Sequence, residues 1–263
     1  MRLSGNTILI TGGTSGIGFE LAAQLLKLGN VVIVTGRDQR RIEETQRELP
    51  GIHAFQSDVT DPKAIALLCD AVITEFPGLN MLFNNAGIMR ATNLLEDRAT
   101  GDLEDISREI ETDLIGPIRM VKRFLPHLLR QPVAAIVNVS SGLAFVPLPI
   151  APIYCAAKAG LHSFTLSLRV QLRSTRVKVF ELAPPMTQTP LFAKDMHVRD
   201  VKGVQMMAVD EMVRRTIRGL KNDRLEIRPG MSNVLKLMSR LAPAFILKRL
   251  SKSVDAMLQQ VGS

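Results

Sequence analysis

The beginning of the chain constrains its fold most strongly. Residues 7–29, "TILITGGTSGIGFELAAQLLKLG", are a short apolar run, a loop with four glycines and an amphipathic stretch. They predict a strand, a tight turn and a helix. Glycines let the backbone approach a pyrophosphate closely, at the positive end of the helix. The spacing G-x-x-x-G-x-G is not that of most dinucleotide folds, but so many glycines in one unit favour such a site over an ordinary turn.

The same alternation of short apolar runs and longer amphipathic stretches continues along the chain, which predicts βαβ units. Right-handed crossovers then place helices on both faces of a parallel sheet. The fold class predicted is α/β, a doubly wound parallel sheet of about seven strands in a single domain. The predicted strands are 7–11, 31–35, 53–57, 80–84, 134–140, 177–182 and 224–228. The predicted helices are 15–28, 38–49, 61–76, 104–130, 154–174 and 205–221.

The composition restricts the cellular locations and the binding partners that can be expected. The first apolar run is too short for a signal peptide, and no run reaches the length of a spanning helix. Two cysteines far apart, Cys69 and Cys155, suit a reducing compartment, so a soluble cytoplasmic protein is expected. The net charge of +8 fits a solvated basic surface, an anionic ligand or a membrane surface. Nucleic acid is disfavoured because aromatics are only 4% and tryptophan is absent.

The end of the second predicted strand, "VTGRDQRR", indicates which dinucleotide is bound. Gly36 stands where an NAD site usually has an acidic residue, and Arg37 follows it. Arg40 and Arg41 add positive charge, and Asp38 is interpreted as the N-cap of the next helix. Arginine suits phosphate geometry, so NADP(H) is favoured over NAD(H).

The chain has one tyrosine, Tyr154, with Lys158 four residues later. Both can point into one site from one helix face. A neighbouring ammonium lowers the pKa of a phenol, which would make Tyr154 a general acid–base. The alternative is an exposed lysine beside a buried tyrosine. Ser141 favours the reactive reading, because it follows the strand 134–140, at whose carboxyl end ligands bind in such sheets.

Five separated motifs together resemble the short-chain dehydrogenase/reductase family and its Rossmann-type sheet. They are "TGGTSGIG" (11–18), "NNAG" (84–87), "VSS" (139–141), "YCAAK" (154–158) and "APPMTQT" (183–189). The match runs from residue 7 to about 190. "SGLAF", "APPMTQT" and "EIRPG" are similar to the DltE-like branch of that family.

The resemblance implies roles at the matching positions. Tyr154 would exchange a proton with the substrate oxygen, Lys158 would bind the nicotinamide ribose, and Ser141 would hydrogen-bond the substrate. The implied cofactor contacts are Gly12, Thr14, Ser15, Gly16, Ile17, Gly18, Arg37, Asp58, Val59, Asn85, Ala86, Gly87, Tyr154, Lys158, Pro184, Thr187 and Thr189. The expected substrate contacts are Ser141, Leu143, Phe145, Tyr154 and Met186. The expected organisation is a core at 7–190, a substrate lid at 190–222 and a helical extension at 231–263.

Two positions depart from the family pattern. Asp113 stands where the family has an active-site asparagine, so it is expected to be a fourth catalytic residue beside Ser141, Tyr154 and Lys158. An ionised carboxylate only accepts hydrogen bonds, whereas an amide also donates. We therefore expect a changed pH profile, or a protein with little reactivity. Pro185 replaces a frequent glycine and should stiffen the loop beside the nicotinamide.

The function expected is NADP(H)-dependent hydride transfer between nicotinamide and a carbonyl or alcohol. The alternative is a dinucleotide-binding regulatory or membrane-associated protein with little turnover. The long helices 112–130 and 154–174 imply, by the resemblance, a homodimer or homotetramer. The scattered histidines predict no metal. The apolar, basic C-terminal segment, with a break near Pro243, packs against the substrate region or a partner, or attaches to a membrane surface.

Overall fold

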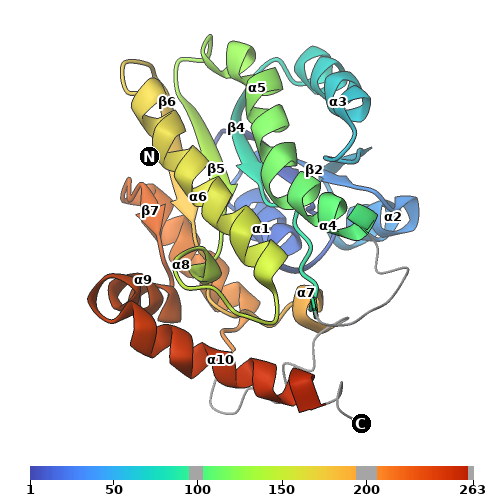
Figure 1. Ribbon diagram of the computed structural model, residues 1–263. Helices are drawn as coiled ribbons and strands as arrows, with labels where there is room; N and C mark the ends of the chain where they lie inside the picture. Colours follow the sequence, from blue (N-terminus) through green and yellow to red (C-terminus); the bar gives the residue numbers. More distant parts are fainter. Residues whose placement is uncertain (95–102, 194–205, 260–263) are drawn as a thin grey trace.

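A seven-stranded parallel sheet forms the centre of the protein, as predicted (Figure 1). The computed structural model describes residues 1–94, 103–193 and 206–259. The strand order is β3-β2-β1-β4-β5-β6-β7, and each neighbouring pair is parallel. The strands are β1 (Thr7–Thr11), β2 (Val31–Gly36), β3 (His53–Gln56), β4 (Leu79–Asn84), β5 (Ala134–Val139), β6 (Val177–Leu182) and β7 (Glu226–Ile227).

Helices cover both faces of this sheet, so the structure is doubly wound (Figure 1). Helices α1 and α8 pack on one face, and α3, α5 and α6 pack on the other. The helices are α1 (Gly16–Lys27), α2 (Gln39–Glu48), α3 (Pro62–Glu75), α4 (Leu103–Ile110), α5 (Gly116–Leu128), α6 (Pro152–Gln171), α7 (Pro190–Ala193), α8 (Val209–Lys221), α9 (Met231–Leu241) and α10 (Pro243–Gln259). A π-helical turn, η1 (Glu111–Ile115), and a 3₁₀ turn, η2 (Gly142–Ala144), complete the set.

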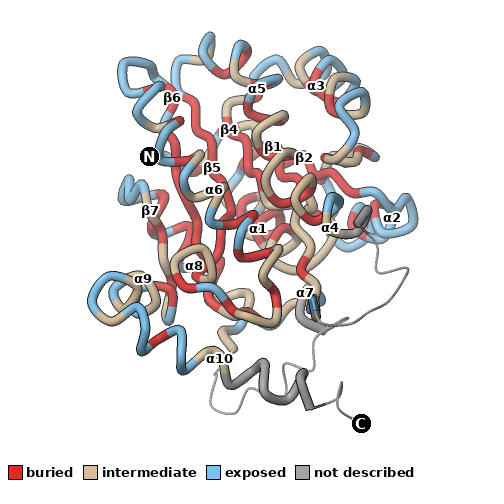
Figure 2. Tube along the Cα trace, in the orientation of Figure 1, coloured by how far each residue is buried: buried red, intermediate tan, exposed pale blue. Residues whose placement is uncertain are grey.

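The central strands are largely apolar because both of their faces are buried, as Figure 2 shows, whereas the edge strand β3 is only partly buried. Ile8 and Ile10 of β1 join the cluster under α1 and α8, while Leu9 between them joins the cluster under α3 and α5. Side chains of a strand alternate between its two faces, so each strand contributes to both clusters. The two clusters hold the carboxyl ends of β1, β4 and β5 in fixed register.

Two predicted segments differ in detail, and a third agrees with the prediction. The predicted helix 104–130 is interrupted by η1, which separates α4 from α5. Residues 194–205 of the predicted lid lie outside the described residues. Helix α8, which follows them, packs into the core, while Glu211 and Arg215 of this helix line the cavity described below. Pro243 begins α10, which explains the break predicted in the C-terminal extension. No helix among the described residues is long and apolar enough to cross a membrane.

Candidate active site

A cavity of about 1630 Å³ lies at the carboxyl ends of the strands. It begins at the glycine loop between β1 and α1 and passes the ends of β4 and β5. The chain turns in opposite directions after β1 and after β4, and ligands of doubly wound sheets bind at such a switch point. The cavity continues past Tyr154 to helices α9 and α10.

The glycine loop is packed so tightly that larger residues would not fit. Gly12 has φ +64°, and a Cβ there would lie 2.8 Å from Cα of Ala86. A Cβ on Gly18 would lie 2.3 Å from the carbonyl oxygen of Gly12, which also accepts a hydrogen bond from Nδ2 of Asn85 at 3.1 Å. The loop therefore brings bare backbone and the N-terminus of α1 to the cavity. A pyrophosphate fits this cradle.

Basic side chains gather where the cavity passes β2. Arg37 and Arg41 line it, and Nη1 of Arg37 lies 3.9 Å from Oδ2 of Asp58. Asp38 caps α2 by accepting a hydrogen bond from the amide of Arg40, as expected. Gly36 leaves no acidic side chain at the end of β2, and a Cβ there would lie 2.8 Å from Cγ2 of Thr14. This end of the cavity can hold an additional phosphate.

Tyr154 and Lys158 lie in the first turns of α6, which Pro152 begins. Both are buried, and Nζ of Lys158 lies 5.6 Å from the centre of the Tyr154 ring. Nζ also donates to the carbonyl oxygen of Val139, at the end of β5, at 3.0 Å. Ser141 lies just beyond that strand and accepts a hydrogen bond from the amide of Leu143 at 3.1 Å. All three predicted groups line the same part of the cavity.

Asp113 reaches this group from the π-helical turn η1. Its Oδ1 forms an ion pair with Nζ of Lys158 at 3.1 Å, and neither side chain is more than 4% exposed. Its Oδ2 accepts a hydrogen bond from the amide of Ile88 at 3.3 Å. A Cβ on Gly87 would lie 2.6 Å from Oδ1, so the carboxylate depends on the glycine opposite it. A π turn inside a helix often marks a functional position.

The pKa of Tyr154 differs from the prediction. Burial raises the pKa of Asp113, and the Lys158 ammonium opposes that shift. Burial, with the charge of Asp113 second, raises the pKa of Tyr154 well above its usual value, and the hydrogen bond from Ser141 opposes the rise. The expected lowering of the Tyr154 pKa by Lys158 is therefore wrong for this structure, because burial dominates and the ammonium is paired with the Asp113 carboxylate. Tyr154 is a neutral phenol that can donate a proton.

Sequence reasoning missed a second carboxyl group, Glu109 of α4. It is 1% exposed and accepts a hydrogen bond from the amide of Arg90 at 3.3 Å. Burial, with the charge of Asp113 second, raises the pKa of Glu109 to about 7. Its position one helical turn before Asp113 is the only signal for it in the sequence.

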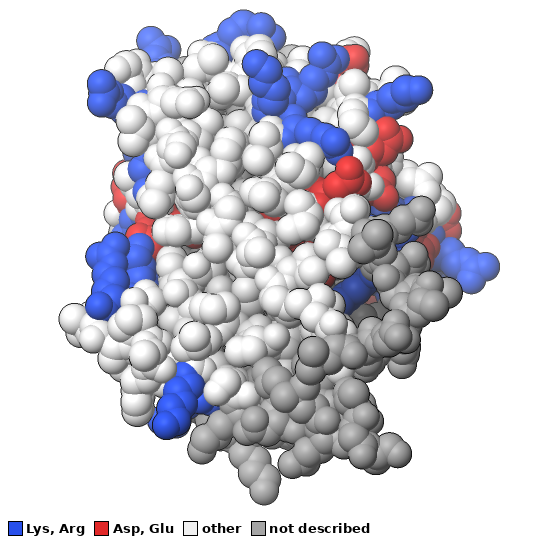
Figure 3. Space-filling model, in the orientation of Figure 1, with Lys and Arg blue, Asp and Glu red and all other residues white. Residues whose placement is uncertain are grey.

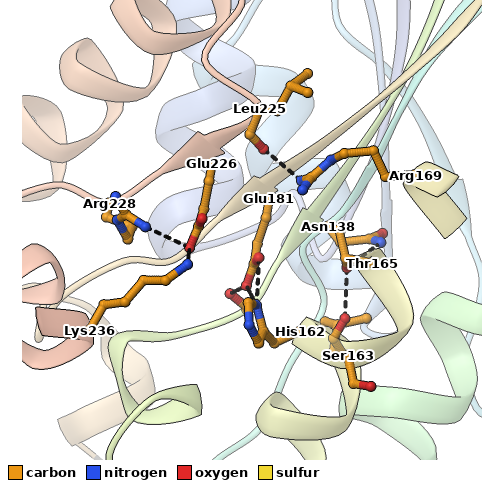
Figure 4. Close-up of polar contacts among 12 residues, drawn as sticks. Asn138, His162, Ser163, Thr165, Arg169, Glu181, Leu225, Glu226, Arg228 and Lys236 are labelled. Carbon is orange, nitrogen blue, oxygen red and sulfur yellow. Dashed lines mark hydrogen bonds and ion pairs between the residues drawn. The ribbon is translucent and has the colours of Figure 1, made fainter. Parts of the chain in front are cut away.

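A partly buried group of polar side chains lies around β6 and β7, behind the end of β5 (Figure 4). Ser140 donates to Oε1 of Glu181 at 2.5 Å, and Nδ1 of His162 lies 2.8 Å from Oε2 of the same carboxylate. Glu226, which pairs with Glu181 in register, forms ion pairs with Lys236 and with Arg228. Each of the two adjacent carboxylates thus has its own cationic or polar partners.

The same group of side chains includes three residues of the kinds that bind metal ions. Ligand atoms of His162, Glu181 and Glu226 lie within 4.8 Å of one another. The cationic groups on Glu226 and the serine on Glu181 already satisfy these carboxylates, so we assign no metal here. The pairing of His162 with Glu181 was not visible in the sequence, where the histidines are scattered.

Most of the predicted contact residues line the cavity, and three do not. Gly18 packs against the loop behind it, and Asp113 acts through Lys158. Phe145 does not line the cavity, because its ring stands edge-on to that of His162 at 5.1 Å. The predicted residues that line it are Gly12, Thr14, Ser15, Gly16, Ile17, Arg37, Asp58, Val59, Asn85, Ala86, Gly87, Ser141, Leu143, Tyr154, Lys158, Pro184, Met186, Thr187 and Thr189.

The loop that contains Pro185 is hydrogen-bonded to the segment that follows β5, next to Ser141. The carbonyl oxygen of Pro184 accepts a hydrogen bond from the amide of Gly142 at 2.9 Å. Thr187 is fully buried, and its hydroxyl donates to the carbonyl oxygen of Pro185 at 2.8 Å. These bonds fix the loop after β6 beside Ser141.

The far wall of the cavity comes from helices α9 and α10. The apolar side chains there are Met231, Val234, Leu235, Met238, Phe245, Ile246 and Leu250. Helix α9 also packs closely against the 3₁₀ turn η2 that follows Ser141, since a Cβ on Gly142 would lie 2.7 Å from Oγ of Ser232. Packing against the substrate region was one alternative predicted for this extension, and α9 and α10 border the cavity beside Gly142.

Comparison with known proteins agrees with this geometry. A sequence model described as short chain dehydrogenase matches residues 6–199. The uncharacterized oxidoreductase DltE of Bacillus subtilis is 46% identical over 229 residues, which cover 86% of this chain and 89% of that protein. A short chain dehydrogenase from Burkholderia cenocepacia, solved in complex with NADP, is 25% identical with a TM-score of 0.81, covering 95% of this chain and 99% of its own. A short chain dehydrogenase/reductase from Burkholderia phymatum, solved with NAD, is 23% identical with a TM-score of 0.79, over 90% and 94% of the two chains.

Proposed function

Because the chain belongs to the short-chain dehydrogenase family, within its DltE-like branch, we propose that this oxidoreductase uses NADP(H) to interconvert a carbonyl and an alcohol. The observation that carries the proposal is the convergence of Ser141, Tyr154 and Lys158 at one end of a cavity whose other end is the glycine cradle. When bound there, the nicotinamide would supply or accept the hydride.

The residues of the chain would bind the cofactor along the cavity. The glycine loop and the N-terminus of α1 would hold the pyrophosphate. Arg37 and Arg41 favour a 2′-phosphate, since no carboxylate extends from Gly36 toward a free ribose hydroxyl. Lys158 would contact the nicotinamide ribose while its ammonium stays paired with Asp113.

Tyr154 would act as the proton donor in the direction of reduction. Its raised pKa keeps the phenol neutral, so the proton is present when a substrate oxygen becomes an alkoxide. The hydroxyl of Ser141 would donate a hydrogen bond to the same oxygen and so orient the carbonyl. The charge of Asp113 opposes formation of a phenolate, which keeps Tyr154 in the protonated form that reduction requires.

The test measures NADPH oxidation with a panel of carbonyl compounds, with Tyr154→Phe as the matched variant. Wild type should turn over at least one class of carbonyl, and Tyr154→Phe should lose the activity while it still binds NADPH. Normal NADPH binding without any turnover that depends on Tyr154 would contradict the proposal and indicate a binding protein. Repeating the assay with NADH tests the choice of cofactor separately.

We also propose that the protein forms a homodimer through the outer face of α6. Leu166 and Val170 are exposed there one helical turn apart, and such a stripe is apolar surface that a second copy can bury. Analytical ultracentrifugation of wild type and Val170→Asp tests this. A monomeric wild type, or a variant that still dimerises, would contradict the interface.

A further inference from the structure

The outer surfaces of α9 and α10 form an exposed apolar face. On α9, Met231, Val234, Leu237 and Leu241 are 57%, 47%, 57% and 72% exposed. They recur every three or four residues, so they make one stripe along the helix. Phe245 and Leu247 extend the apolar surface onto α10. We call this set the C-terminal face.

The charge around the C-terminal face has one sign. Arg240, Lys248 and Arg249 are exposed beside the apolar stripe. The sequence from 229 to 254 contains no aspartate and no glutamate. In Figure 3 the surface over α9 is mostly uncharged, with basic side chains beside it. The acidic side chain next to α9, Glu226, is already paired with Lys236 and Arg228. An apolar stripe with a basic edge complements an anionic, partly apolar surface.

The C-terminal face is continuous with the catalytic cavity. Met231, Val234 and Phe245 are exposed on the face and also line the cavity. Met238 and Ile246 line it as well, and Ile246 is buried. The cavity is thus bordered by an apolar rim, and a strongly polar substrate would gain nothing from such a rim.

A second copy of the chain fits the C-terminal face less well than a lipid surface does. A two-fold interface is self-complementary, so it would bring the basic edge of one copy to the basic edge of the other. No acidic residue within 229–254 could offset that repulsion. An anionic bilayer offers acyl chains to the leucines and headgroups to the arginines and lysines at once.

We propose that the C-terminal face docks the protein on an anionic membrane surface, with the cavity opening toward the lipid. The helices lie in the interface plane and do not span the bilayer. Docking would deliver an apolar carbonyl or alcohol that partitions into lipid directly to Ser141 and Tyr154. This consequence for the substrate rests on the proposed oxidoreductase function, whereas docking itself does not.

The test is flotation of the full chain, saturated with NADP(H), with two kinds of vesicle. Wild type should float with vesicles of phosphatidylglycerol and phosphatidylcholine, less so at high salt, and stay unbound with phosphatidylcholine alone. The double variant Leu237→Gln/Leu241→Gln should bind the anionic vesicles at least about tenfold more weakly, because two exposed apolar side chains are lost. Neither residue lines the cavity, so turnover in solution should not change.

Two further variants separate the contributions. Leu67→Gln is the matched control, since Leu67 of α3 has the same 72% exposure as Leu241 and lies elsewhere. It should bind vesicles like wild type. Arg240→Gln/Lys248→Gln should weaken binding to anionic vesicles by roughly fivefold for each charge removed.

Several results would overturn the proposal. They are no binding of wild type to anionic vesicles, equal binding to neutral ones, or an equal loss in Leu67→Gln. A change of oligomeric state in Leu237→Gln/Leu241→Gln, with no vesicle binding by wild type, would assign the face to a second copy. A chain that binds vesicles but turns over no carbonyl would refute only the proposed reaction.

Discussion

Replacing Asp113 by asparagine should lower the pKa of Tyr154. The carboxylate raises that pKa in two ways, because its own charge disfavours the phenolate and because it neutralises the Lys158 ammonium at 3.1 Å. Asparagine has nearly the same shape, but its single side-chain oxygen can replace either Oδ1 at Lys158 or Oδ2 at the amide of Ile88, and we expect it to face the Lys158 ammonium. The substitution therefore changes charge with little change in packing.

The distance between Lys158 and Tyr154 sets the size of the effect. An unpaired ammonium 5.6 Å from the ring centre, at an effective dielectric constant of about 20, stabilises a phenolate by about 3 kcal/mol. That energy corresponds to roughly 2 pKa units. Burial of Tyr154 is unchanged in the variant, so its contribution to the raised pKa remains.

The assay uses the fact that the chain has one tyrosine and no tryptophan. The near-ultraviolet absorbance of phenolate then reports Tyr154 alone, without any substrate. Titration toward alkaline pH, with circular dichroism as a check on folding, should show the midpoint in Asp113→Asn shifted down by roughly 2 units. In the oxidative direction, the pH at which turnover rises should fall by the same amount.

Glu111→Gln is the matched control. Glu111 lies in the same π-helical turn, but its side chain is 44% exposed and pairs with Arg119. Its removal should leave the titration of Tyr154 unchanged. A midpoint in Asp113→Asn equal to that of wild type, or above it, would refute the electrostatic account of the site.

Three other substitutions test separate parts of the site. Glu109→Gln should remove a titration near pH 7 from the pH dependence of kcat/KM, because its carboxyl group has a pKa of about 7; an unchanged profile would place Glu109 outside the reaction. Arg37→Asp should shift the ratio of kcat/KM for NADPH and NADH toward NADH by tenfold or more, since one charge-assisted contact to phosphate is lost, on the order of 1.5–3 kcal/mol; an unchanged ratio contradicts the assignment. Gly87→Ala should destabilise the protein by about 1–3 kcal/mol in urea unfolding, because the new Cβ would lie 2.6 Å from Oδ1 of Asp113. Gly78→Ala is its control, with an ordinary 3.6 Å contact, and equal losses in both variants would contradict this reading.

Local patterns in the sequence were sufficient to predict the sheet and to bring Ser141, Tyr154 and Lys158 together in one cavity. The glycine loop, the apolar strands and the spacing of Tyr154 and Lys158 each depend on neighbours in the chain. Contacts between distant segments were not predictable in this way. The edge-on contact of Phe145 with His162 and the cavity wall built by α9 depend on tertiary packing that no periodicity encodes.

The pKa of Tyr154 shows the same limit in electrostatics. Spacing placed a lysine beside the tyrosine, which predicted a lowered pKa. The shift has the other sign chiefly because the tyrosine is buried, and secondly because of the charge of a carboxylate from η1, forty-one residues before it, which also pairs with that lysine. A one-residue departure from the family pattern thus changes the charge balance of the site without changing its shape.

The cavity is built from two parts of the chain that can be separated by design. The glycine cradle, Arg37 and Tyr154 precede residue 199, where the match to the family ends, whereas the far wall comes from α9 and α10. Transplanting the C-terminal helices between relatives should therefore exchange substrate choice and leave cofactor choice in place. Two contacts join these parts: Ser232 packs against Gly142, and Lys236 pairs with Glu226. A chimaeric protein must therefore preserve both contacts.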